Sequence, residues 1–214
     1  MRKILGALGG LTIFSALIWL GLIQPVVAKG KEWVTLENCE LVPNPGNDGD
    51  SFHIRSDGTE YFVRLYFVDA PEIKGIPGPE RLVAQAEYFG ISVPQVIEVG
   101  RQAKALVDAA LSERFTVVTR MAQGLGRSRV VRFYGIVKTK NGDLAEQLVA
   151  HGLVRVHGVR AAPPDGPNSG EIARKLEQLE NEAKEKKVGA WGMNANAAGA
   201  APQQHKPLAG SDPG

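Results

Sequence analysis

The stretch that decides the fold runs from Asp48 to Glu72 and reads DGDSFHIRSDGTEYFVRLYFVDAPE. It opens with an acidic Asp-Gly-Asp turn that leads into an alternating run at 51–54, and an Asp-Gly turn then returns the chain into a second run at 60–68. Asp-Gly between two alternating runs is a strong signal for a β-hairpin. Pro71 ends the second strand because it has no backbone N–H to donate. The stretch therefore predicts two paired strands with acidic residues at both ends.

One arginine lies among the apolar residues of the second predicted strand. Burial of Arg64 is costly unless anions surround it. Asp50, Asp69 and Glu72 are close in sequence and converge on the two ends of the hairpin. Converging carboxylates repel one another unless a cation lies between them, and oxygen-only ligands suit calcium or magnesium rather than zinc. The hairpin thus predicts a carboxylate metal site beside an arginine, a combination suited to phosphate.

Two motifs in this stretch resemble the signature of the thermonuclease (staphylococcal nuclease-like) family. They are DGDS at 48–51 and RLYFVDAPE at 64–72, which match the family pattern D-G-D-[TS] followed by R-L-x-x-[VI]-D-[TA]-P-E. The resemblance covers roughly residues 34–191. It implies an α+β fold built on an OB-fold-like five-stranded β-barrel with inserted and appended helices, which agrees with the pattern of short strands. It also implies hydrolysis of DNA, with RNA as a second candidate substrate, at low sequence specificity.

The resemblance assigns the metal ligands residue by residue. Asp50 and Asp69 would bind one calcium ion through their carboxylates, and Ala70 would bind it through its main-chain carbonyl. The family often has threonine at the position of Ala70, a change that a carbonyl ligand should tolerate. Asp48 would form the turn or support the ligands from behind.

The resemblance also assigns the catalytic residues. Arg64 would hold the phosphate bidentately, which lysine cannot do. Glu72 would orient or deprotonate the attacking water, with a water positioned by the metal alone as the rival mechanism. The family's second arginine matches Arg132 best, and Arg129 and Arg127 are the alternatives.

The chain departs from the family pattern around this second arginine and beyond it. Val130 and Val131 replace the family's Tyr-Gly. Gly158 and Arg160 lie about where the family has tyrosines that contact the nucleotide. We therefore expect a base preference that differs from the family's.

Net charge does not point to nucleic acid. The formal charge is +2, and residues 1–28 contribute Arg2 and Lys3 but no acid, so the rest of the chain is close to neutral. However, the stretch 114–140 contains seven basic residues and no acid. This stretch is either a solvated basic face or, beside a phosphate site, a patch that steers nucleic acid. The expected members of such a patch are Arg120, Arg127, Arg129 and Lys138.

Residues 1–28 have the pattern of an export signal: a basic start, an apolar core and a small-residue cleavage site that ends at Ala28. We expect cleavage and export to the periplasm or the medium. An uncleaved leader that anchors the protein in a membrane is the alternative. Residues 29–192 then form one nuclease-like domain, and 193–214 a disordered tail. Cys39 is the single cysteine, which excludes an intramolecular disulfide, and we expect a monomer.

Helical spacing and turn signals outline the remaining elements. The family usually has one helix where this chain has two, so 81–100 is an inserted helical segment, which we interpret as packing on the barrel rather than as a lid over the site. We expect further strands at 33–42, 115–119, 129–138 and 153–156, and helices at 80–89, from Ser92 to Leu111, at 144–151, and at 170–187 with Ser169 as cap.

Two alternatives stay open. The domain is also compatible with a catalytically silent OB-type module that binds nucleic acid through its basic stretch. The hairpin cluster itself is compatible with a purely structural pair between Arg64 and Asp69. That interpretation leaves Asp50 and Glu72 unexplained. The four histidines have no carboxylate or cysteine at ligand spacing, which argues against a zinc mechanism.

Overall fold

The structure is a computed structural model that describes residues 32–73, 79–123 and 132–197. The expected leader at 1–28 lies outside these residues, as do Arg127, Arg129 and most of the expected tail. Among the helices in the described ranges, none is long and apolar enough to cross a membrane.

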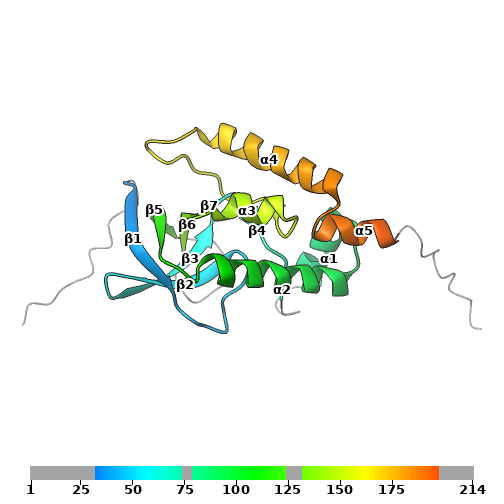
Figure 1. Cartoon of the computed structure of the whole chain (residues 1–214), viewed down its shortest axis with the longest axis horizontal. Helices are drawn as coiled ribbons and strands as arrows, with labels where there is room; N and C mark the ends of the chain where they lie inside the picture. Colours follow the sequence, from blue (N-terminus) through cyan, green and yellow to red (C-terminus); the bar gives the residue numbers. More distant parts are fainter. Residues whose placement is uncertain (1–31, 74–78, 124–131, 198–214) are drawn as a thin grey trace, which may run out of the picture.

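Five strands form a closed β-barrel, which confirms the predicted OB-like α+β fold (Figure 1). In the sheet, neighbouring strands follow the order β3, β2, β1, β5 and β6, and a parallel pairing of β3 with β6 closes the barrel. The strands are β1 (Val34–Leu41), β2 (Ser51–Ser56), β3 (Thr59–Leu65), β5 (Phe115–Gln123) and β6 (Phe133–Thr139). The described residues also contain three two-residue strands: β7 (Gly142–Asp143) pairs antiparallel with the end of β6, and β4 (Val68–Asp69) pairs with β8 (Arg155–Val156).

The predicted hairpin is confirmed as β2 and β3. Asp57 and Gly58 both have positive φ, 46° and 75°, as a type I′ turn requires. The antiparallel register places Ser51 opposite Arg64 and buries Phe52 in the barrel. Alternation along the strand then directs Arg64 to the other face, toward the acidic turn.

The described residues contain five helices: α1 (Pro79–Phe89), α2 (Val93–Ala110), α3 (Leu144–Ala150), α4 (Ser169–Lys186) and α5 (Ala190–Ala197). Figure 1 shows α3 between α2 and α4, with α1 and α5 together at the end of the molecule away from β1.

Two predictions at the C-terminal helices were wrong in detail. The N-cap of α4 is Asn168 and not Ser169: its side chain accepts hydrogen bonds from the N–H groups of Gly170 and Glu171. Both residue types can cap a helix, so the sequence alone did not separate them. In addition, α5 enters the stretch 193–214 that we expected to be disordered, because Trp191 anchors its first turn on the domain.

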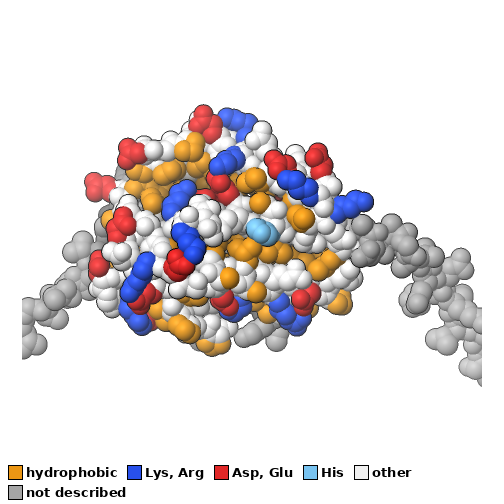
Figure 2. Space-filling view, viewed as in Figure 1, with side chains coloured by type: hydrophobic (Ala, Val, Ile, Leu, Met, Phe, Trp, Pro, Cys, Tyr) orange, Lys and Arg blue, Asp and Glu red, His pale blue; other side chains and the backbone are white. Residues whose placement is uncertain are grey.

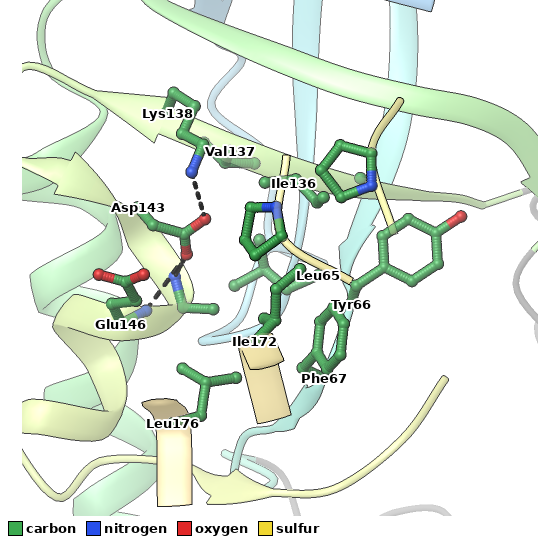
Figure 3. A pocket seen from close by; sticks show the side chains of 14 residues that line it. Leu65, Tyr66, Phe67, Ile136, Val137, Lys138, Asp143, Glu146, Ile172 and Leu176 are labelled. Carbon is green, nitrogen blue, oxygen red and sulfur yellow. Dashed lines mark hydrogen bonds and ion pairs between the residues drawn. The ribbon is translucent and has the colours of Figure 1, made fainter. Parts of the chain in front are cut away.

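Helix α4 covers one side of the barrel. Ile172 and Leu176 point toward Leu65 and Ile136 of the barrel and line a cavity of about 70 Å³ between the two layers (Figure 3). The charged residues of its lining are Glu146 and the ion pair of Lys138 with Asp143. The contacts belong to the core that holds α4 on the strands.

The inserted helix α1 is fastened to the C-terminal helices. The Tyr88 hydroxyl donates a hydrogen bond to Glu180 of α4, and the ring of Phe89 lies 5.0 Å from that of Trp191 in α5. Trp191 thus docks on the inserted helix. The insertion therefore packs against other helices rather than on the barrel strands alone, and Arg81 and Gln85, on the same side of α1 as Tyr88, reach the acidic hairpin.

Candidate functional site

The acidic turn that precedes β2 is shaped by its first residue. One carboxylate oxygen of Asp48, Oδ1, accepts hydrogen bonds from the backbone N–H groups of Asp50 at 3.0 Å and Ser51 at 2.7 Å. The side chain thus holds the turn closed and directs the carboxylate of Asp50 inward.

Asp50 is buried and joins the two ends of the hairpin. Its Oδ1 accepts from the Ser51 hydroxyl at 2.6 Å and from Nη1 of Arg64 at 2.9 Å. Its Oδ2 accepts from the backbone N–H of Ala70 at 2.8 Å. The carboxylate therefore fixes the start of the loop that carries the other candidate ligands.

Asp69 is the centre of the cluster. Its Oδ1 accepts from Nη2 of Arg64 at 2.9 Å and from Arg81. Its Oδ2 accepts from Nε of Arg155 at 2.8 Å and from Nε2 of Gln85 at 3.0 Å. Burial alone would raise the pKa of Asp69, but the charges of Arg81 and Arg155 hold the pKa below its usual value.

Glu72 lies at the open edge of the cluster. Its carboxylate pairs with Nη1 of Arg81 at 2.5 Å. Burial nevertheless raises the pKa of Glu72 above its ordinary value, because it outweighs the opposing charge of Arg81. Together with Asp48 and Lys104, Glu72 lines a cavity of about 240 Å³ that opens to solvent. Water can therefore reach the side of the cluster that Asp48 and Glu72 form.

Three residues of the cluster were missed by sequence reasoning. Arg81 and Gln85 lie four residues apart on α1, so they share one face of this inserted helix. Arg155 lies directly opposite Asp69 in the pairing of β4 with β8. The available signals were an Arg and a Gln at helical spacing beside buried apolar positions, and an arginine inside the apolar run 153–156.

Helix α2 approaches the loop of the site very closely. A Cβ atom on Gly100 would lie 2.5 Å from the carbonyl oxygen of Pro71, and one on Gly49 would lie 2.6 Å from Cβ of Ala103. Both distances are shorter than side chains tolerate. Glycine at these two positions therefore lets the helix support the loop backbone directly behind Ala70 and Glu72.

The structure does not bring Arg132 to the carboxylates. Its guanidinium lies 5.6 Å from the ring centre of Phe62, and its Nε has no hydrogen-bond partner among the described residues. In the described part of the chain, the arginines that contact the carboxylates are Arg64, Arg81 and Arg155. A role of Arg132 in catalysis stays a prediction.

The expected basic patch is described only in part. Arg120 lies over the ring of Trp33 at 5.8 Å, and Lys138 pairs with Asp143 at 3.0 Å. Figure 2 shows acidic and basic side chains interspersed over the visible face. The patch stays a prediction, and the pairing of Lys138 reduces its share of any steering field.

The donor chemistry of the cluster fits a hard cation. The carboxylates of Asp50 and Asp69 and the carbonyl of Ala70 would hold calcium, since all are oxygen ligands. Burial and then the charge of Asp50 raise the pKa of Asp48 to about 8. The ionised form of Asp48 is therefore disfavoured, and a nearby cation would stabilise it. Within the described ranges, however, no three acidic, histidine or cysteine side chains form a ready-made ligand set.

The closed barrel places the chain among OB-like α+β domains. The buried cluster of carboxylates also contains arginines, the side chains that bind phosphate bidentately. A family model described as staphylococcal nuclease homologue matches residues 62–193, more than half of the chain. The chain belongs to this family, which supports a nuclease-like or nucleic-acid-binding module with nucleic acid as its partner. The match includes Arg64, Asp69 and Glu72 but begins after Asp50. No curated protein matches the chain.

Proposed function

We propose that this protein is an exported nuclease that hydrolyses phosphodiester bonds of DNA, with RNA as a second substrate, at low sequence specificity and with one calcium ion. The observation that carries the proposal is the contact of Arg64 with both Asp50 and Asp69. Glu72 follows Asp69 three residues later in the sequence. A phosphate-binding group, the candidate metal ligands and a candidate base are thereby gathered in one place.

Arg64 is suited to bind the reacting phosphate. Its Nη1 and Nη2 atoms donate to Asp50 and Asp69, which holds the guanidinium plane in a fixed orientation. Nη1 also donates to the Ser51 hydroxyl at 3.2 Å, and because a guanidinium carries five N–H donors, two of them remain for phosphate oxygens. Charge that develops on these oxygens in the transition state would then meet a preorganised cation.

Glu72 is suited to accept a proton from the attacking water. Its raised pKa brings the carboxylate closer to neutral pH, where a general base works best. It also borders the solvent-open cavity that supplies the water. When bound by Asp50, Asp69 and the Ala70 carbonyl, calcium would supply charge relief to a phosphate oxygen.

The deciding experiment is digestion of single-stranded DNA and of RNA by residues 29–214, first with calcium and then with a chelator. We expect cleavage with calcium only, and loss of cleavage in Glu72→Gln. Glu98→Gln is the matched control, because Glu98 is an exposed residue of α2 that pairs with Arg101. Full activity of Glu72→Gln would remove this residue from the mechanism. Mass spectrometry of the exported protein tests whether Lys29 is the first residue.

One observation favours a second function, a catalytically silent nucleic-acid-binding module. Both oxygens of Asp69 already accept two hydrogen bonds each from side chains of the protein, so this carboxylate is satisfied without a metal. Binding of oligonucleotides that weakens with salt, with no cleavage in the presence of calcium, would select this function.

A further inference from the structure

A single guanidinium bridges two acidic residues with different proposed roles. Arg81 donates through Nη2 to Asp69, a candidate calcium ligand, and through Nη1 to Glu72, the candidate base, at 2.5 Å. On Asp69, both Arg81 and Arg64 bind the same oxygen, Oδ1. A calcium ion bound by Asp69 would therefore have to share this oxygen with two guanidinium groups unless one of them moved.

Exposure indicates which of the site's arginines can move. The side chain of Arg81 is 37% exposed, whereas those of Arg64 and Arg155 are 14% and 15% exposed. A phosphate that arrives from solvent thus meets Arg81 more readily than the other two. An arginine side chain has several rotatable bonds, so its head can change partners without a shift of the backbone.

The backbone beneath Arg81 is firmly placed. Gln85, one helical turn further, is fully buried and bonded to both Asp69 and the Ala70 carbonyl. At the other end of α1, Tyr88 is bonded to Glu180. The helix therefore presents the arginine at a fixed distance from the carboxylates.

We propose that Arg81 of the inserted helix binds the substrate phosphate, and that in the protein without substrate this arginine is paired with Asp69 and Glu72 instead. The inference rests on the proposed function. It assigns the insertion a direct part in the site, and it supplies a second phosphate-binding arginine where Arg132 lies over Phe62 instead. The ligand class is a phosphodiester, whose paired oxygens match the fork of a guanidinium.

The exchange is favourable on charge grounds. Once a cation neutralises Asp69, the guanidinium loses its anionic partner there and keeps a strong preference for another oxyanion. Transfer to the phosphate also frees Glu72 from its ion pair, so the carboxylate can accept a proton. One side-chain movement would thus couple substrate binding to release of the candidate base.

Direct binding tests this proposal without reliance on cleavage. Fluorescence anisotropy of a labelled single-stranded oligodeoxynucleotide, with calcium, compares Glu72→Gln with the double variant Glu72→Gln/Arg81→Gln across a salt series. We expect the double variant to bind about tenfold more weakly, with the slope of log affinity against log salt reduced by about 0.7, as for one lost phosphate contact on a single strand. Arg101→Gln, in the same background, is the charge-matched control and should bind unchanged, because Arg101 is exposed on α2 and pairs there with Glu98.

Cleavage kinetics and calorimetry of calcium binding distinguish two roles of Arg81: binding of the substrate phosphate, or mere competition with calcium for Asp69. In the protein with Glu72 unchanged, Arg81→Gln should lower kcat/KM about tenfold or more. Arg81→Lys should restore part of the loss because it keeps the charge. Tighter calcium binding combined with equal or faster cleavage would show that Arg81 only competes with the metal, which would overturn the proposal. An unchanged salt slope in the double variant would also overturn it.

The two proposals fail in different ways. If the unmodified protein does not cleave, the proposed function fails, and the salt slope still decides whether Arg81 contacts phosphate. If it cleaves and Arg81→Gln neither weakens binding nor slows cleavage, only the role of Arg81 fails. Thermal unfolding of each variant tests whether it is folded, and Arg81→Met, which also removes the charge, serves in place of Arg81→Gln if the latter is not.

Discussion

The side-chain amide of Gln85 lies between Asp69 and the main chain that follows it. Its Nε2 donates to Oδ2 of Asp69 and to the carbonyl oxygen of Ala70, both at 3.0 Å, and its Oε1 accepts a longer bond from the N–H of Glu72 at 3.4 Å. One buried amide thus fixes both the side chain and the backbone of the candidate ligands. It also ties the inserted helix to the loop that carries them.

Replacement of Gln85 by leucine should therefore weaken the fold and the site together. Buried acceptors on Asp69 and Ala70 would lose a donor, which costs about 1–3 kcal/mol. We expect this loss in the free energy of unfolding, measured by urea denaturation. Gln147→Leu is the matched control: its amide bonds Thr139 near the surface, where water can replace it. Equal losses in the two variants would contradict the structural role of Gln85.

Arg64 and Arg132 should respond differently to the same conservative change. Arg64→Lys replaces a fork held by Asp50 and Asp69, and a lysine cannot contact both carboxylates and a phosphate, so kcat/KM should fall about 100-fold. Arg132→Lys should cost less than about tenfold if the residue acts only through its stacking on Phe62. Steady-state cleavage assays measure both. A larger loss for Arg132→Lys would place this arginine on the substrate after all.

Gly100→Ala should damage the site through the backbone. In an open helix this change stabilises a protein by up to about 1 kcal/mol. Here the added methyl group would lie 2.5 Å from the carbonyl oxygen of Pro71, so the loop before Glu72 must shift. We expect a lower melting temperature and a larger relative loss in cleavage rate. A stabilised variant with full activity would show that the loop yields without effect.

Much of the fold was predictable because its signals are local. Alternation, the Asp57-Gly58 turn and the stop at Pro71 define the hairpin within a short window, and the family motif rests on the same residues. The ion pair between Arg64 and Asp69 also follows from this window.

The rest of the site depends on contacts between distant parts of the chain. Arg81 and Gln85 reach the cluster only because α1 is docked by Tyr88 and Trp191 against helices near the C-terminus. The pairing of Arg155 with Asp69 depends on two-residue strands that carry almost no pattern of their own. Propensity and spacing report neighbours in sequence, so these arrangements were outside their reach.

The raised pKa of Asp48 predicts a pH dependence of stability in calcium-free protein. The pKa is 3.8 for an ordinary aspartate and about 8 in the folded protein, so the folded state binds the extra proton between these values. Stability from this group is therefore present below pH 4 and is lost as pH rises toward 8. Asp48→Asn keeps the acceptor for the N–H groups of Asp50 and Ser51 but cannot ionise. We expect urea denaturation to show a flatter profile from pH 5 to pH 8 in this variant, and an unchanged slope would contradict the shift.

Tyr88 should affect stability and substrate affinity although no hydrogen bond joins it to the carboxylates of the proposed reaction within the described residues. Its hydroxyl donates to Glu180, and the guanidinium of Arg155 lies 6.0 Å from its ring centre, so it joins α1 to the two elements behind the site. Tyr88→Phe leaves the buried carboxylate of Glu180 with one donor fewer, which should cost about 1–3 kcal/mol in urea denaturation.

The same variant should also loosen the helix that carries Arg81, so substrate affinity should fall further than a stability change elsewhere would cause. Tyr61→Phe is the matched control, because it removes a hydroxyl from β3 and leaves the hydrogen bond between Tyr88 and Glu180 intact. If both variants bind oligonucleotide equally well while only Tyr88→Phe loses stability, the anchoring of α1 serves the fold and not the site. If Tyr88→Phe binds more weakly at a temperature where it is fully folded, the position of the inserted helix itself sets the affinity of the site.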